Sequence, residues 1–208
     1  MSISKPITGA VVILAAGITA GVVIPAPALT THVALNHSRT PGNVRLASTT
    51  SVLADGSVTV NFLGGVILTV APGWTIDKSW GSGIWAHNTG NTAQIGISFG
   101  KSHAPDITGN MAWCISADTT VLGYTNVVQD PSPAGVQAVQ GKNFTQALTV
   151  GYTAIYQGDE GTIQYHGSWA LLFNVSTQLS ACINLRANSA DTLAAAMPAA
   201  HSMIASML

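Results

Sequence analysis

Apolar and polar residues alternate in several short segments after residue 50, a pattern that predicts β-strands. In AQIGISFG, residues 93–100, the side chains of Ile95, Ile97 and Phe99 share one face, and small or polar residues occupy the other. The segment LSACINLRA, residues 179–187, predicts a further strand. Both segments are the length of an ordinary half-buried strand.

Two pairs of segments predict antiparallel hairpins. Residues 57–62 and 66–70 are rich in β-branched side chains and are separated by a Leu-Gly-Gly step. Residues 144–157 and 162–173 flank the turn Gly-Asp-Glu-Gly at 158–161, whose glycines can adopt the positive φ of a tight reversal.

The second hairpin has one register that separates polar from apolar pairs. If Gln157 lies opposite Thr162, one face is polar and the other is apolar along the whole hairpin. The predicted pairs are Thr153 with His166 and Gly151 with Ser168 on the polar face, and Tyr156 with Ile163, Val150 with Trp169 and Leu148 with Leu171 on the apolar face.

Two segments have helical spacing and cap residues. Asp106 is a candidate N-cap and Gly123 a C-terminal stop, and a buried stripe is expected at Ile107, Met111, Cys114, Ile115 and Leu122. Ser189 caps a C-terminal helix that Pro198 is expected to kink or to restart. The order of elements predicts the α+β class, an antiparallel β-sheet with a mid-chain helix and a C-terminal helix packed on it.

The N-terminus carries an export signal. Lys5 precedes an uncharged run at residues 7–24, and Ala-Pro-Ala at 26–28 offers small residues for signal peptidase. We expect a signal peptide at 1–28, a flexible leader at 29–50 and one domain at 51–208. The alternative is an N-terminal membrane anchor, since 18 helical residues reach about 27 Å.

Composition narrows the class of protein. Charged residues make up 7% of the chain and the net charge is -1, so no basic surface is available for nucleic acid. The two cysteines, Cys114 and Cys182, are predicted to form a disulfide in an oxidising compartment, two buried free thiols being the alternative. No Cys-x-x-Cys or Cys/His cluster is present that would indicate a metal site, and no cofactor is expected.

Two sets of residues are candidates for a binding surface. Trp80 and Trp85 flank Gly81-Ser82-Gly83, so an exposed aromatic is expected at a hairpin tip, whereas Trp74 is expected in the core. The second set is the polar face of the later hairpin. The alternative to a binding role is that this face is simply exposed to solvent or covered by a helix. The set consists of Thr149, Thr153, Gln164, His166 and Ser168.

The segment GISFG, residues 96–100, matches the nucleophile elbow Gly-x-Ser-x-Gly and suggests an esterase-like serine hydrolase as an alternative. Ser98 would be the nucleophile. The candidate bases are His166 and His201, and the candidate acids are Asp118, Asp130 and Asp159. Against this, alternation runs straight through Ser98, where an elbow needs a sharp turn. His87 and His103 are predicted in loops without a carboxylate spaced to orient them.

The segment VAPGW, residues 70–74, resembles the "v-P-x-G-W" entry of the PsbP-like fold, as in the LpqN/LpqT-type exported proteins of actinobacteria. The later helix, long hairpin and C-terminal helix follow in the matching order, so the resemblance covers residues 56–208. It implies a PsbP-like α/β/α sandwich and a binding or assembly protein without a catalytic set. The chain departs from the Lpq lipoproteins in lacking their lipobox, and the cysteine pair is not attributable to the family.

Together these patterns predict a secreted or cell-envelope, non-enzymatic protein that binds an unknown protein or envelope component. The alternatives are the small exported hydrolase and a structural or secretion-associated envelope factor that self-associates. Contact with a membrane is expected only through the N-terminal segment, if that segment is not cleaved.

Overall fold

The computed structural model describes residues 49–208, apart from 63, 132–133 and 159–160. The predicted signal peptide and residues 29–48 of the predicted leader lie outside the described residues. The first strand begins at Thr49, two residues before the predicted domain boundary. Within the described ranges, no helix combines the length and apolar character that crossing a membrane requires.

The described residues form strands and two helices in the α+β class. The elements are β1 (Thr49–Val52), β2 (Val58–Asn61), β3 (Ile67–Val70), β4 (Trp74–Trp80), β5 (Gly83–Asn88), β6 (Ala93–Lys101), α1 (Ile107–Leu122), β7 (Tyr124–Gln129), β8 (Ala134–Ala138), β9 (Gln146–Gly158), β10 (Gly161–Asn174), β11 (Leu179–Ala187) and α2 (Ala190–Met207).

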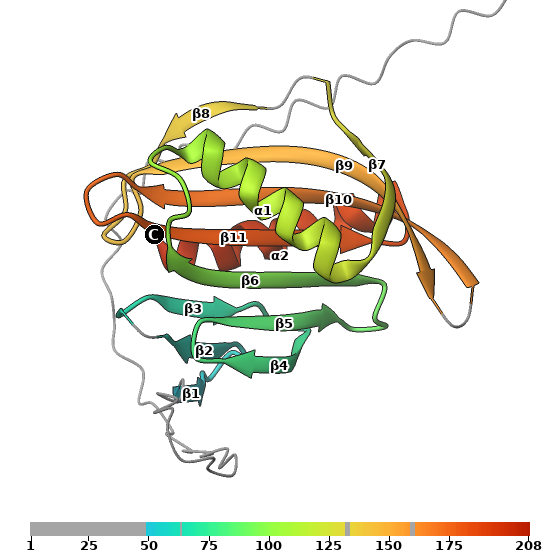
Figure 1. Cartoon of the computed structure of the whole chain (residues 1–208). Coiled ribbons are helices and arrows are strands. Elements are labelled where there is room, and N and C mark those ends of the chain that lie inside the picture. Colours follow the sequence, from blue (N-terminus) through green and yellow to red (C-terminus); the bar gives the residue numbers. More distant parts are fainter. Residues whose placement is uncertain (1–48, 63, 132–133, 159–160) are drawn as a thin grey trace, which may run out of the picture.

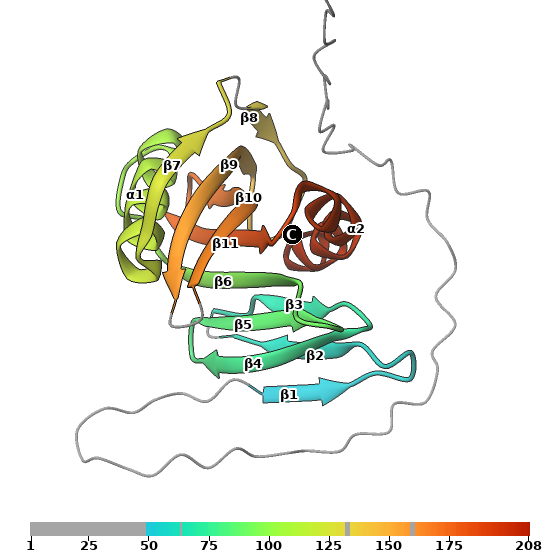
Figure 2. The ribbon, with the colours of Figure 1, turned by 90° about the vertical axis from the view of Figure 1, so that its right-hand side faces the viewer.

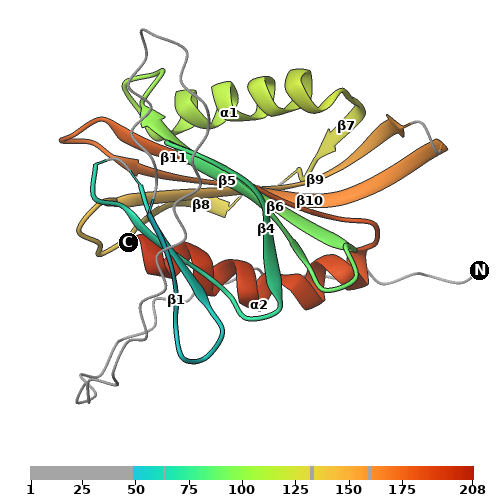
Figure 3. The same ribbon diagram turned by 90° about the horizontal axis from the view of Figure 1, so that it is seen from below.

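The strands make two antiparallel sheets. The large sheet has the order β4-β5-β6-β11-β10-β9-β7, with β8 also paired to β9, and the small sheet has the order β1-β2-β3. Figure 2 shows α1 on one face of the large sheet and α2 on the other, and Figure 3 shows the same layers from below. The predicted hairpin of β2 and β3 is confirmed, but it belongs to the small sheet.

Helix α1 covers the apolar face of the β9-β10 hairpin. Asp106 is its N-cap and accepts a hydrogen bond from the Gly109 N–H, while Gly123 ends the helix with a φ of 67°. Both cap predictions are confirmed. The side chains buried beneath α1 include Met111, Cys114, Leu148, Val150, Trp169 and Leu171.

The predicted register of β9 and β10 is also confirmed. Gln157 lies opposite Thr162, and Val150 lies opposite Trp169, whose side chain is fully buried. Because successive side chains of a strand point to opposite faces, this register places the pairs Val150–Trp169 and Leu148–Leu171 under α1, while the apolar pair Ala147–Leu172 faces α2.

Helix α2 covers the other face of the large sheet together with the small sheet. Ser189 is the predicted N-cap, and α2 runs through Pro198 as one helix, so the proline does not divide it. The Thr69 N–H of β3 donates to Ser206 Oγ of α2 at 2.8 Å. Trp74 is buried in this core, as predicted. The core therefore has two parts, one on each side of the large sheet.

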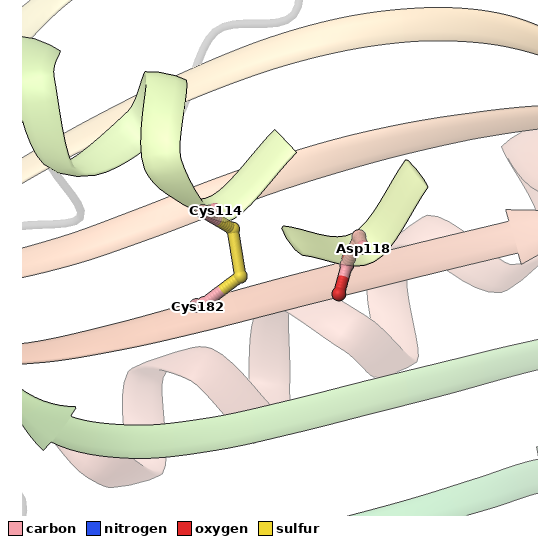
Figure 4. Close-up of side chains that lie close together, drawn as sticks. All are labelled: Cys114, Asp118 and Cys182. Carbon is pink, nitrogen blue, oxygen red and sulfur yellow. A yellow bond between two sulfur atoms is a disulfide. The ribbon is translucent and has the colours of Figure 1, made fainter. Parts of the chain in front are cut away.

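A disulfide joins α1 to the centre of the large sheet. Cys114 of α1 and Cys182 of β11 are bonded, with their Cα atoms 5.9 Å apart (Figure 4). The pair is separated by 68 residues in the sequence. On the chain-entropy account, closing a loop of this length stabilises the fold by about 4 kcal/mol.

Candidate binding surface on the α1 side of the sheet

Helix α1 packs on β7, β9, β10 and β11, and no helix of the described residues covers the remaining end of this face of the large sheet. In Figure 1, β4, β5 and β6 lie beyond α1 at that end. The register places Trp85 opposite Gly96 and His87 opposite Gln94, and Gln94 opposite Arg186 of β11. These side chains share the face that α1 covers only in part.

The rings of Trp80 and Trp85 pack directly on glycines of this face. A Cβ placed on Gly96 would come within 2.7 to 2.9 Å of three ring atoms of Trp85, and one on Gly83 would meet the ring of Trp80 at 2.5 Å. Both tryptophans are half-buried. The predicted turn at Gly81-Ser82 is present, but Trp80 lies against the sheet and does not extend from the hairpin tip.

Arg186 lies on this face among aromatic rings. Its Cζ atom is 5.1 Å from the ring centroid of Trp85, 4.9 Å from that of Tyr165 and 5.8 Å from that of Tyr124. Its Nε and Nη2 donate to Gln94 Oε1 at 3.0 and 2.6 Å, and its Nη1 donates to the Tyr124 hydroxyl at 2.7 Å.

We call the set Trp80, Trp85, Tyr124, Tyr165 and Arg186 the arginine–aromatic surface. Four of the five side chains are half-buried and Tyr124 is buried. Cation–π contacts and hydrogen bonds to neutral oxygens hold the guanidinium in place, and no carboxylate of the described residues forms an ion pair with it. Such an arrangement can bind an anion or an aromatic group of a partner.

Beside this surface, a polar network lies beneath α1. Asp118 Oδ2 accepts hydrogen bonds from Trp169 Nε1 at 3.0 Å and from Asn184 Nδ2 at 2.9 Å, and the Tyr152 hydroxyl donates to Asn184 Oδ1 at 2.7 Å. Tyr152 also stacks on Trp169, with ring centroids 3.7 Å apart. The network fixes the positions of side chains between α1 and the sheet.

Burial controls the titration of this network. Desolvation raises the pKa of Asp118, although hydrogen bonds from Asn184 and Trp169 and the charge of Arg186 act in the opposite direction. Desolvation is also the main reason that the pKa values of Tyr124 and Tyr152 are raised. The two phenols therefore stay neutral at physiological pH.

Asp118 also lies beside the disulfide (Figure 4). One ligand atom each of Cys114, Asp118 and Cys182 lies within 4.8 Å of the others. Because both sulfurs are bonded to each other, neither is a thiolate that could bind a metal ion.

The prediction that His87 is a loop residue without a carboxylate is wrong. His87 belongs to β5, and its Nδ1 lies 2.6 Å from Asp77 Oδ1 of β4. A register shift between Ile76 and Lys78 places Asp77 in the irregular part of β4. His103 precedes α1 and stacks on Trp113, with ring centroids 3.6 Å apart.

The other predicted binding residues lie on the opposite face of the sheet. Thr149, Thr153, Gln164, His166 and Ser168 share the α2 side with Ala170 and Leu172, which belong to or pack against the α2-side core. Gln164 is exposed and the other four are half-buried. The hydroxyl of Thr149 is buried without a hydrogen-bond partner among the described residues. The two predicted binding sets, the tryptophans Trp80 and Trp85 and this polar face, therefore lie on opposite sides of the sheet.

The structure does not bring the residues of the hydrolase alternative together. Ser98 lies within β6, opposite Gly83 and Cys182, on the α1 side. His166 is on the α2 side of the sheet and His201 belongs to α2. Asp118 shares the side of Ser98 but bonds to Trp169 and Asn184.

Of the other two candidate acids, Asp130 is the one that the structure describes. Asp130 lies over Gly151, on the α2 side, and Asp159 lies outside the described residues. The strand runs straight through GISFG, so the sharp turn of a nucleophile elbow is missing.

Sequence reasoning missed Arg186, Tyr124, Tyr165 and the network of Asp118. One signal was available for Arg186, which is the only charged residue in the strand LSACINLRA. A charged side chain at such a position is rarely buried without partners. The partners themselves come from β6, β7 and β10, far away in the sequence.

Comparison with known proteins adds a likeness of overall structure. No protein-family model matches the chain, and no curated protein matches it. It is similar to the Ran-binding protein Mog1p of Saccharomyces cerevisiae, with a TM-score of 0.47 and 12% identity, over 73% of this chain and 92% of that chain. A point mutant of protein Mog1 gives a TM-score of 0.46 with the same identity and coverage. At this level of similarity, neither structure indicates what this chain binds.

Proposed function

We propose that the chain is an exported, non-enzymatic binding protein of the PsbP-like, LpqN/LpqT type that acts outside the cytoplasm or in the cell envelope. Its binding surface is the arginine–aromatic surface on the α1 side of the large sheet. The polar face on the α2 side, with Thr149, Thr153, Gln164, His166 and Ser168, is the competing candidate that the experiment below distinguishes from it.

The observation that carries this proposal is the environment of Arg186. The guanidinium lies against the rings of Trp85 and Tyr165 and donates hydrogen bonds to neutral acceptors. Partial burial of a charged group costs free energy. Because Arg186 is only half-buried, a partner can still reach it. Tryptophan, tyrosine and arginine are also the side chains enriched where protein partners bind most strongly.

Export is supported by two features of the chain. Residues 1–28 have the order of regions found in signal peptides. The disulfide between Cys114 and Cys182 is of a kind that persists in oxidising compartments. N-terminal sequencing of exported material is expected to begin at residue 29, and an intact Met1 in the membrane fraction would show that the segment is retained.

Affinity capture tests the binding surface. The disulfide-bonded protein is immobilised and exposed to culture filtrate and envelope extract of the source organism, beside the variants Trp85→Ala and Gln164→Ala. Gln164 is exposed on the α2 side and serves as the matched control. Wild type and Gln164→Ala are expected to retain the same component and Trp85→Ala to lose it, provided that circular dichroism shows all three folded.

The proposal fails if the three proteins retain the same component equally, because the α1 side is then not involved. It also fails if nothing is enriched on any of them. If only Gln164→Ala fails to retain the component, the binding surface lies on the α2 side of the sheet.

A further inference from the structure

Arg186 has hydrogen-bonding capacity that the protein does not use. A guanidinium carries five N–H groups. Three of them are used by the bonds to Gln94 and Tyr124, one each from Nε, Nη1 and Nη2. Within the described part of the chain, the remaining N–H on each terminal nitrogen has no hydrogen-bond acceptor.

Arg186 forms no ion pair with a carboxylate of the described residues, although its charge acts on the pKa of Asp118. The ion pair found among residues 49–208, as far as they are described, joins Asp77 and His87, and Arg186 forms none. Asp118 is the carboxylate whose titration Arg186 affects, and its Oδ2 already accepts two hydrogen bonds. A half-buried cation in this position favours a negatively charged partner.

A second cation lies on the same face. Lys78 of β4 is directly opposite Trp85, so it shares the α1 side with Arg186, which lies over the Trp85 ring. Trp85 is therefore flanked by Lys78 on one side and Arg186 on the other. Lys78 is exposed and adds a positive charge at the β4 end of this face, where the carboxylate of Asp77 lies against His87.

The shape of this region fits a polypeptide better than a small molecule. Two hollows of the described structure lie elsewhere, one of about 440 Å³ between Trp74 and α2 and one of about 540 Å³ between α1 and β8. Small ligands prefer concave pockets, whereas an open surface with aromatic side chains suits a protein segment.

We propose that the arginine–aromatic surface binds an acidic segment of a partner protein, in which an Asp or Glu carboxylate meets the two free N–H groups of Arg186. An aromatic or aliphatic neighbour of that carboxylate contacts Trp80 and Trp85. A hydrogen bond from a guanidinium to a carboxylate is charge-assisted and is therefore stronger than a hydrogen bond between neutral groups. This inference rests on the proposed function and adds the chemistry of the partner.

Selection from a random 12-residue peptide library tests the inference on the full-length, disulfide-bonded protein. Peptides retained by wild type are expected to share an Asp or Glu next to an aromatic or aliphatic residue. These peptides are expected to be lost in a parallel selection on Arg186→Gln. They are expected to be retained on the control variant Lys142→Gln, which also removes one positive charge, at an exposed position far from Arg186 in the sequence.

A double substitution then isolates the contact. One selected peptide is synthesised with its acid intact and with the acid changed to the amide, and both are titrated by fluorescence anisotropy. On wild type, the change from acid to amide is expected to raise the dissociation constant about tenfold. A hydrogen bond to a charged group contributes about 1.5 kcal/mol or more to binding, and about 1.4 kcal/mol corresponds to a factor of ten. On Arg186→Gln, the dissociation constants of the acid and amide peptides are expected to agree within about twofold. On wild type, added salt is expected to weaken binding of the acidic peptide.

Three outcomes would overturn the inference. Selected peptides that lack acids, or that bind Arg186→Gln as well as wild type, would show that no carboxylate meets Arg186. If such peptides are still lost on Trp85→Ala, the proposed function stands without this inference. If no peptide is selected, while a galacturonic acid hexamer binds wild type and not Arg186→Gln, the partner is an acidic glycan.

Discussion

Gly96→Ala tests whether the Trp85 ring lies on the sheet as described. Gly96 is in the interior of β6, and its backbone is not in the positive-φ region, so the change adds only a methyl group. That methyl carbon would be 2.7 to 2.9 Å from ring atoms Cη2, Cζ3 and Cζ2 of Trp85. Since carbon atoms pack at about 3.5 to 4.0 Å, the ring must move by about 1 Å.

The structure also sets the expected cost. The atoms in the way are the far end of a half-buried side chain, so the ring can swing outward without moving the backbone. Overpacking in a core costs about 1 to 3 kcal/mol, and a ring free to swing outward falls at the low end of that range. Replacing glycine also stabilises by about 0.4 to 1 kcal/mol through the unfolded chain. The free energy of unfolding should therefore change by less than about 1 kcal/mol.

Fluorine NMR of protein labelled with 5-fluorotryptophan measures the displacement directly. The Trp85 resonance, assigned with Trp85→Phe, is expected to shift in Gly96→Ala, while that of buried Trp169 stays in place. The matched control is Gly100→Ala, on the same face of the same strand, where an added Cβ meets no atom within 4 Å. Equal spectra for the two variants would refute the placement of Trp85, and a loss above about 3 kcal/mol would show that the ring cannot move.

Three further predictions concern stability. Replacing both Cys114 and Cys182 by serine should lower the free energy of unfolding by about 4 kcal/mol in denaturant titrations, and an unchanged midpoint would contradict the disulfide. Tyr152→Phe should cost about 1 to 3 kcal/mol in the same assay because the buried Asn184 Oδ1 loses its donor, and a neutral effect would contradict that bond. The pKa of Asp118 is raised on folding, so its contribution to stability is present below the unfolded value of about 3.8 and is lost as pH rises through the folded pKa. Asp118→Asn should therefore gain stability relative to wild type across that pH window, whereas parallel curves would contradict the raised pKa.

The elements that could be predicted are those encoded by neighbouring residues. The turn at Gly158 and Gly161, with alternation on both sides, was enough to predict the register of β9 and β10 to the residue. Asp106 and Gly123 marked the ends of α1 because caps are local signals. The disulfide could be predicted because the chain has two cysteines, an even number, and because the sequence predicts export to an oxidising compartment.

The candidate site could not be predicted in the same way, because its parts are far apart in sequence. Arg186 meets Gln94 only because β11 pairs with β6, and Tyr124 and Tyr165 reach it from β7 and β10. Hydrophobic periodicity says which face of a strand is buried and does not say which strands are neighbours. It also gave no sign that an irregularity in β4 would bring Asp77 to His87.

Photo-crosslinking tests most directly whether the α1 side of the sheet binds the partner. p-Benzoylphenylalanine replaces Trp80 on the α1 side or exposed Gln164 on the α2 side of the full-length protein, which is produced in the source organism and irradiated. The account predicts one discrete crosslinked product from position 80 and none from position 164. Crosslinks of equal yield from both positions, or from 164 alone, would contradict it.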